Sequence, residues 1–171
     1  MTVTPTGTTT ETILSTILET MASCLCGQII EDGSPEPCAC GVFAGAGVPL
    51  DVGNCHKKDG LAYVLLNTSY PSTEVGVADL TPGNCAKGLG FDIQVGIYRS
   101  FPINRDGSSP PADVMLSVFR QQMKDEQSIR RALTCCDWLP SKDFVVGQYN
   151  PYGPNGGVVG GAYPISALLV V

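Results

Sequence analysis

The groups in this chain most able to do chemistry are eight cysteines and one histidine. Thiolate sulfur and imidazole nitrogen are zinc ligands, and four of them can hold the ion tetrahedrally. Structural zinc sites usually place about two to four residues between paired cysteines, whereas the pairs here have one residue between them, which is poor support for a shared metal. Disulfides and free buried thiols are the competing interpretations. The candidate zinc ligands are Cys24, Cys26, Cys38, Cys40, Cys55 and His56.

Nucleophilic and acid–base catalysis find little support in the sequence. A nucleophilic cysteine needs a nearby base, and the one histidine, His56, directly follows Cys55, which does not supply the side-chain geometry. The acidic residues form no paired arrangement that indicates general acid and base catalysis. The glycine pairs do not follow a strand and open a helix, as a phosphate-binding loop requires. We therefore predict no enzymatic activity, no catalytic residues and no cofactor.

The charge of the chain is low and negative. Charged residues make up 15% of the sequence, against about 25% in an average soluble domain, and the formal net charge is −6. We expect part of the surface to be buried against other subunits, because soluble monomers rarely expose large apolar patches. The alternative is a monomer rich in glycine and threonine with long neutral loops. The negative charge also argues against binding to nucleic-acid backbones, which requires clustered Lys and Arg.

The N-terminal sequence and the cysteine content give conflicting indications of the compartment. MTVTPTGTTTE lacks the basic start and apolar core of a secretion signal. No apolar run approaches the roughly 20 residues of a transmembrane helix, so we expect synthesis in a cytoplasm and no membrane partner. Disulfides are uncommon in that compartment. A particle that assembles inside a cell and is released later removes the conflict, because its thiols can oxidise after assembly.

The first half of the chain predicts one short helix and one strand. After a flexible segment, 1–10, residues 11–22 place apolar side chains on one helical stripe, and the helix is expected to end before Cys24. Residues 23–58 are predicted to be a long loop rich in Cys, Gly and Pro, which a cross-link or a partner must order. The run LAYVLL at 61–66 predicts a strand that Tyr70 and Pro71 close.

The second half predicts a strand, a helix and a hairpin. The run FDIQVGI at 91–97 alternates apolar and polar residues, the period of a strand with one buried face. A helix from Pro111 places Met115, Phe119 and Met123 on one face, and the weaker pattern at 125–128 predicts a kink or a short second helix. Two apolar runs in the closing segment, separated by Gly, Pro and Asn, are typical of a hairpin.

These elements predict the fold class α+β, with a small, mostly antiparallel sheet packed with two helices. The order of the elements is helix, strand, strand, helix, strand, strand. No internal repeat or linker divides the sequence, so residues 1–171 are predicted to form a single domain.

Several stretches, taken in order, resemble one protein family. They are PCACGVFAGAGVPLDVGNC at 37–55, GLAYVLLNTSYPS at 60–72, Cys85, FDIQVGIYRSFP at 91–102, the segment 110–136 ending in RRALTCC, and VVGQYNPYGPNGGVVGGAYPISALLVV at 145–171. In this order they are similar to the tail terminators in the neck of long-tailed phages that infect actinobacteria. The chain departs from that pattern at Tyr149 and Tyr163, where the family often has Trp, and in its additional pair Cys24-Leu25-Cys26.

The resemblance implies a structural virion protein. Tail terminators form a six-fold ring on the last layer of the tail tube, stop its polymerisation and present a surface to the head. The implied partners are further copies of the chain, the tail tube protein and the head-side connector or stopper, with genomic DNA passing through the lumen without specific binding. The implied location is the neck of the virion, after assembly in the host cytoplasm. The alternatives are the head-to-tail stopper of the same neck and, more distantly, a small cysteine-rich metal-binding or redox domain.

The expected contacts and cross-links follow from these segments. We expect the loop from Arg99 to Ser108 and the hairpin tip from Asn150 to Gly157 to contact neighbouring subunits or tail partners. Tyrosines near flexible Gly and Pro either serve such contacts or cover the edge of the core. The adjacent Cys135 and Cys136 cannot easily bond to each other, so different partners are predicted for them. The interface candidates are Arg99, Phe101, Arg105, Asp106, Tyr149, Tyr152 and Asn155, and the disulfide candidates are Cys38, Cys40, Cys55, Cys85, Cys135 and Cys136.

Overall fold

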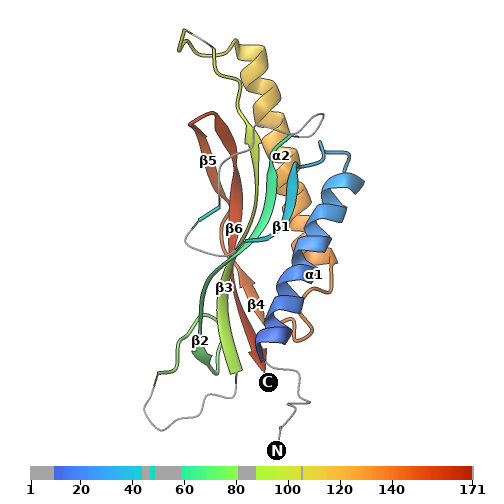
Figure 1. Cartoon of the computed structure of the whole chain (residues 1–171), viewed down its shortest axis with the longest axis vertical. Coiled ribbons are helices and arrows are strands. Elements are labelled where there is room, and N and C mark those ends of the chain that lie inside the picture. Colours follow the sequence, from blue (N-terminus) through green and yellow to red (C-terminus); the bar gives the residue numbers. More distant parts are fainter. Residues whose placement is uncertain (1–9, 44–46, 49–58, 81–87, 105, 171) are drawn as a thin grey trace, which may run out of the picture.

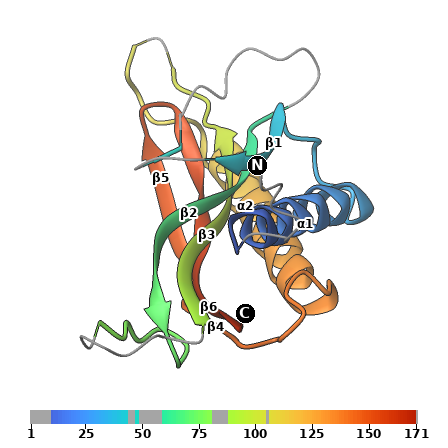
Figure 2. The ribbon, with the colours of Figure 1, turned by 60° about the horizontal axis from the view of Figure 1, so that its bottom comes forward.

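The computed structural model describes residues 10–43, 47–48, 59–80, 88–104 and 106–170. Within them, both helices lie on one face of a single sheet (Figures 1 and 2), which confirms the predicted α+β class. The elements are α1 (Thr10–Glu31), β1 (Ala39–Phe43), β2 (Leu61–Ser72), β3 (Gly88–Ser100), α2 (Ala112–Cys135), β4 (Phe144–Val146), β5 (Asn150–Asn155) and β6 (Val158–Val170).

The sheet is mostly antiparallel, as the sequence predicts. The strand order is β1-β2-β3-β6-β4, and β5 also pairs with β6. Only β1 and β2 pair in parallel among the strands that the structure describes. The predicted C-terminal hairpin is present as β4 and β6, which pair antiparallel, but most of its predicted tip, 150–157, forms the additional strand β5. β6 is a central strand that pairs with β3 along the whole of its length. The C-terminal apolar run is therefore a structural part of the sheet.

α1 is longer than its sequence pattern predicts. The expected end near Ala22 is wrong, because Leu25 and Ile29 extend the buried stripe and the helix continues to Glu31. It ends where Gly33 adopts a φ of 66°, a conformation that favours glycine and that commonly terminates helices. By length and hydropathy α1 is long and apolar enough to cross a membrane, but here its apolar stripe packs into the core.

The region predicted as one long loop, 23–58, contains regular structure in its described part. Its first residues belong to α1, and β1 forms an edge strand of the sheet. The sequence of β1, ACGVF, is short and contains cysteine and glycine, so it shows no strand periodicity. This strand contributes one wall of a surface cleft described below.

The main hydrophobic core lies between the sheet and the two helices. Every second residue of β3 points into it, and these four side chains are at most 1% exposed. Burying an aliphatic or aromatic side chain of this size stabilises the fold by about 1.5–3 kcal/mol. The core therefore holds the sheet to the helices along the middle of the molecule. The four residues of β3 are Phe91, Ile93, Val95 and Ile97, and they pack with Met21, Leu25 and Ile29 of α1 and with Ile129 and Leu133 of α2.

The opposite face of the sheet carries a smaller aromatic cluster. Tyr63 of β2 is 1% exposed, and its ring centroid lies 5.1 Å from that of Tyr98 in β3. Gly96 lies beneath Tyr63, where an added Cβ would be 2.6 Å from the tyrosine hydroxyl oxygen. The absence of a side chain at Gly96 therefore lets the Tyr63 ring lie flat on the sheet. Burial raises the pKa of Tyr63.

α2 is one continuous helix. The kink or second helix predicted at 125–128 is wrong, because α2 runs unbroken from Ala112 to Cys135 and two of the polar residues there, Asp125 and Ser128, are buried and bonded. Asp125 is paired with Arg99, and the Ser128 hydroxyl donates to Asp32 at 2.8 Å. The interruption in the apolar pattern marks the point where α2 docks on the fold.

Candidate interaction surfaces

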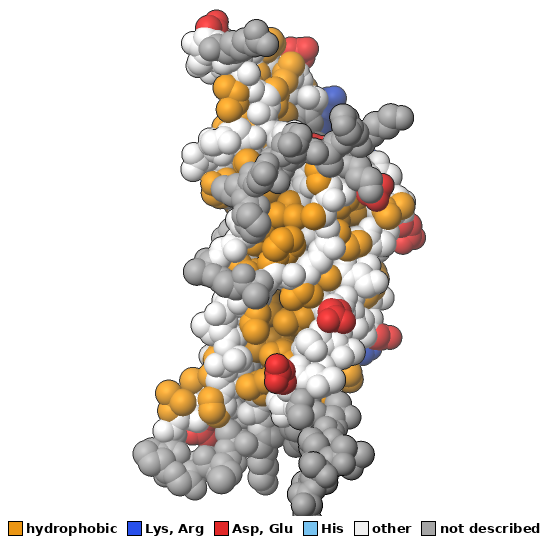
Figure 3. Space-filling model, in the orientation of Figure 1, with side chains coloured by type: hydrophobic (Ala, Val, Ile, Leu, Met, Phe, Trp, Pro, Cys, Tyr) orange, Lys and Arg blue, Asp and Glu red, His pale blue; other side chains and the backbone are white. Residues whose placement is uncertain are grey.

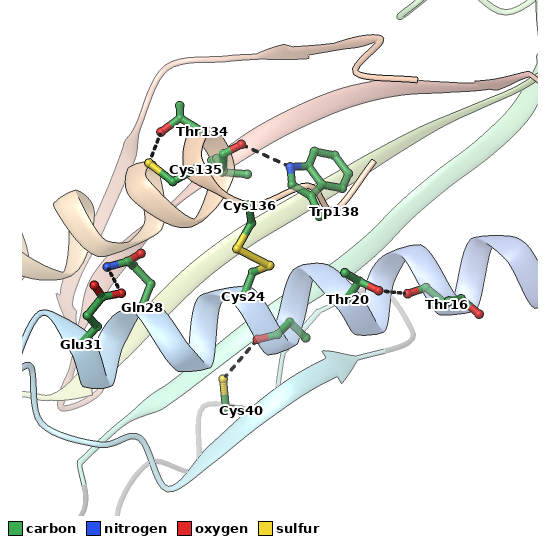
Figure 4. Close-up of a disulfide and its surroundings, with 12 residues drawn as sticks. Thr16, Thr20, Cys24, Gln28, Glu31, Cys40, Thr134, Cys135, Cys136 and Trp138 are labelled. Atoms are coloured by element: carbon green, nitrogen blue, oxygen red, sulfur yellow. Dashed lines mark hydrogen bonds between the residues drawn. A yellow bond between two sulfur atoms is a disulfide. The ribbon is translucent and has the colours of Figure 1, made fainter. Parts of the chain in front are cut away.

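Two disulfides join α1 to its neighbours. Cys24 is bonded to Cys136 directly after α2, and Cys26 is bonded to Cys40 in β1, with Cα atoms 6.2 and 6.1 Å apart. Both separations are ordinary for disulfides. Figure 4 shows the first bond between the two helices, with Cys40 on the other side of α1. α1 is therefore held covalently from two sides, and such bonds typically stabilise a fold by about 2–4 kcal/mol each.

The disulfides correct the cysteine predictions from the sequence. Cys24 and Cys26 are not among the predicted disulfide cysteines, but both are bonded, and both lie in α1 beyond its predicted end. Cys135 was a candidate and is instead a free, exposed thiol, with its sulfur 3.7 Å from the Thr134 hydroxyl oxygen. In Figure 4 Cys135 points away from the bond that its neighbour Cys136 forms.

The remaining cysteine candidates divide into two groups. Cys40, Cys136 and also Cys38 are disulfide-bonded. Cys55 and Cys85 lie outside the described residues.

The zinc alternative is contradicted for the proposed ligands that the structure describes. Cys24, Cys26, Cys38 and Cys40 are all in disulfides, and a metal ligand must be a thiolate. The other two proposed ligands, Cys55 and His56, are outside the described part of the chain. Within that part, no three His, Cys, Asp or Glu residues come together in a way that could hold a metal ion.

Arg99 lies inside the fold, so its prediction as an interface residue is wrong. It is 3% exposed, and its Nε and Nη2 donate to the two carboxylate oxygens of Asp125 at 2.9 and 2.8 Å. Its Nη1 donates to the carbonyl oxygens of Pro35 and Asp59. A buried ion pair is tolerated when further hydrogen bonds satisfy both groups. Arg99 therefore ties β3 to α2 and to the segments on either side of β1.

A second polar cluster lies where the two helices meet. Asp32, just after α1, accepts hydrogen bonds from Ser128 and Arg131 of α2 and from Gln28 of α1. Together with the Arg99–Asp125 pair, this cluster fixes the C-terminal half of α2 against α1 and β3. These groups hold the fold together, and the charges in them are already paired.

The two segments proposed as contact loops lie against each other. The Phe101 N–H donates to the Gly157 carbonyl at 2.7 Å. Beside this bond, the two segments line a shallow cavity of about 260 Å³. Exposed Asp106 accepts hydrogen bonds from the hydroxyl and N–H of Ser108, which lower the pKa of that carboxyl. Arg105 lies outside the described residues. The cavity lining includes Phe101, Ile103, Met115, Pro154 and Asn155.

The candidate interface tyrosines are half-buried and pack on the sheet. The ring centroid of Tyr149 lies 5.3 Å from that of Tyr163, and Tyr152 lies 5.2 Å from Tyr98. The Tyr163 hydroxyl donates to Glu126 of α2. Burial raises the pKa of Tyr149 and of Tyr163 to about 12. Tyr149 and Tyr163 cover the sheet beside the middle of α2, whereas Tyr152 joins the aromatic cluster on the opposite face. Each ring leaves only part of its surface for a partner.

The N-terminal half of α2, residues 112–123, carries an apolar face that stays exposed in the part of the chain that the structure describes, and we call this half the α2 overhang. Met115, Leu116, Phe119 and Met123 are between 39% and 55% exposed, although their spacing is that of a buried helix face. Figure 1 shows this part of α2 extending past α1. The adjacent loop adds Ile103, which is 63% exposed.

A second surface is a cleft of about 510 Å³ between α1 and β1, which we call the α1–β1 cleft. Its floor contains the Cys26–Cys40 disulfide, and Glu19 stands at its edge on α1. Figure 3 shows a hydrophobic band along this side of the molecule, with scattered acidic side chains and few basic ones. The other lining residues are Ala22, Ser23, Gly41 and Val42.

Comparison with known proteins assigns no family to the chain and no role to these surfaces. No family model matches the chain, and no curated protein matches it.

Proposed function

We propose that this protein is a tail terminator, a structural subunit of the phage neck that forms a ring on the tail tube and stops its polymerisation. The observation that carries the proposal is the α2 overhang, which presents four large apolar side chains on a chain of low charge. Soluble monomers rarely leave such a face uncovered, so the overhang indicates assembly. The ordered resemblance of the sequence segments to tail terminators indicates which assembly this is.

The proposed action depends on shape and involves no chemical turnover. A closed ring requires each subunit to contact the next through two different surfaces. The chain offers two unlike surfaces, the α2 overhang and the α1–β1 cleft. Termination then needs one ring face that matches the growing end of the tube and an opposite face that offers no copy of it.

Composition and cross-links agree with this role. A net charge of −6 disfavours adhesion of DNA that passes through a lumen. The disulfides hold α1 to α2 and to β1, and such bonds suit a particle that leaves the reducing cytoplasm. The 101–108 loop and the β5–β6 tip lie together and form one further contact region for the tail tube or the head-side connector.

The test is the phenotype of a phage that lacks the protein, combined with mass in solution. We expect purified protein to form a ring of about six copies and the mutant phage to make overlong or disordered tails. If the mutant instead makes normal tails and heads that leak DNA, the protein is the head-to-tail stopper. Absence of the protein from purified virions would refute both neck functions.

A further inference from the structure

The α2 overhang keeps one apolar face exposed beside the body of the protein. Its first side chains that hydrogen-bond to the body, among the described residues, are Gln121, which donates to Ser34, and Gln122, which donates to the Gly160 carbonyl. Ser117 and Val118 line a cavity against β3 and β6, so they do not belong to the exposed face. The nine residues before Gln121 extend about 13 Å at about 1.5 Å per residue. Phe119, in the last turn of this stretch, is 55% exposed. A partner can therefore cover this helix face without disturbing the fold.

The α1–β1 cleft has complementary properties. Its walls carry small residues, Ala22, Ser23 and Gly41, which allow the backbone of another helix to approach closely. Val42 is 39% exposed in its wall, and the floor disulfide fixes the two walls to each other. The cleft is therefore a preformed receptor for an apolar helix.

The charges on the two surfaces also match. α1 contains three glutamates and no Lys or Arg, and Glu19 lies at the edge of the cleft. Arg120 is exposed on the overhang next to Phe119, and neither Arg120 nor Glu19 forms an ion pair with any residue that the structure describes. Complementary charges of this kind fix the register of a contact.

We propose that the α2 overhang of one copy lies in the α1–β1 cleft of the next copy, with Arg120 opposite Glu19. The occupant is a second copy because the helix and the cleft are separate surfaces of the same chain that agree in apolar character and in charge. Such a contact is heterologous, and repeated around an axis it closes a ring. The inference rests on the proposed function and adds to it the surfaces through which the subunits join.

A charge-reversal cycle tests the contact. The Arg120→Glu and Glu19→Arg variants should each raise the concentration at half-assembly at least about tenfold, because each places like charges opposite each other. The Arg120→Glu/Glu19→Arg double variant should return to within about threefold of the wild type. Mass would be followed by sedimentation. The matched control is Arg130→Glu, whose arginine is 60% exposed on α2 and pairs with Glu126 of its own copy; it should assemble like the wild type.

The outcomes separate the contact from the function. Two results would overturn the proposed contact without affecting the proposal of a ring. One is single variants that assemble like the wild type, and the other is a double variant whose concentration at half-assembly is no lower than that of the single variants. Wild-type protein that stays monomeric but caps isolated tail tubes would also overturn it, because a different partner then covers the overhang. Monomers that do not bind tail tubes would remove the proposed function as well. Phe119→Ser, which should weaken assembly without reversing a charge, provides an independent check if a charge variant fails to fold.

Discussion

The two halves of α2 have opposite relations to the rest of the protein. In the C-terminal half, residues 125–135, the apolar stripe and even the polar side chains of Asp125 and Ser128 are buried, and a disulfide follows at Cys136. In the α2 overhang the same helical spacing places four large apolar residues in solvent. One helix therefore combines a part that stabilises the fold with a part that is available to a partner.

Helical periodicity therefore identifies an apolar face but not what covers it. Both halves of α2 carry apolar residues at the spacing of a buried face, and only those of the second half are buried by the described part of the chain. Substitutions in the two halves should therefore separate folding from assembly. Effects on stability should come from the docked half and effects on association from the overhang.

The largest expected effect is loss of the buried ion pair that docks α2. Asp125→Ala leaves the guanidinium of Arg99 buried without its counter-charge, and we expect the free energy of unfolding to fall by about 3–5 kcal/mol. Urea unfolding followed by circular dichroism measures this change. A loss below about 1 kcal/mol, the value of an exposed pair, would show that the pair is not desolvated.

The double variant Arg99→Leu/Asp125→Leu is the control for that experiment. Replacing both charges by apolar side chains often restores stability. Here the recovery should be partial, because the carbonyl oxygens of Pro35 and Asp59 also lose their donor.

A matched pair of alanine substitutions makes the comparison within α2 direct. Ile129→Ala in the docked half removes a fully buried side chain and should cost about 2–5 kcal/mol. Phe119→Ala in the overhang should change the stability of the monomer by no more than about 0.5 kcal/mol, because its ring contributes little to the core. Thermal unfolding of dilute protein measures both. Equal losses would mean that the overhang is part of the monomer's core.

The buried ion pair is visible in the sequence in retrospect. Arg99 continues the alternation of Phe91, Ile93, Val95 and Ile97, so it falls on the buried face of β3. Asp125 is four residues before Ile129 and lies on the apolar stripe of α2. A buried charge needs an opposite charge, so each position indicates a pair. Their mutual partnership could not be predicted, because it depends on how the strand and helix cross.

Other features lay beyond sequence reasoning for physical reasons. The strands at 61–66 and 91–97 are predictable because a short apolar run and apolar–polar alternation are local signals, and the α+β class follows from their order with the helices. β1 was missed because a short edge strand gains its stability from pairing with β2. The C-terminal turns of α1 are not predictable from their cysteines, which are typical of cross-linked loops, although Leu25 and Ile29 continue the helical stripe.

The smallest expected effect concerns the tyrosines beside the junction of the two halves of α2. Tyr149 and Tyr163 have pKa values of about 12 in the folded protein and 10.0 as the ordinary value, because burial disfavours the phenolate. Because these pKa values are higher in the folded protein, the unfolded chain loses the two phenol protons first as the pH rises. The contribution of the two tyrosines to stability is therefore complete below pH 10 and is lost between pH 10 and 12. The Tyr149→Phe/Tyr163→Phe variant cannot ionise at these positions, so its melting temperature should fall less than that of the parent between those pH values.

Both proteins should carry Cys135→Ser, which prevents the free thiolate from attacking the disulfides in alkali. Identical pH profiles would show that the rings titrate as they do in solvent, and that this junction is open even without a partner.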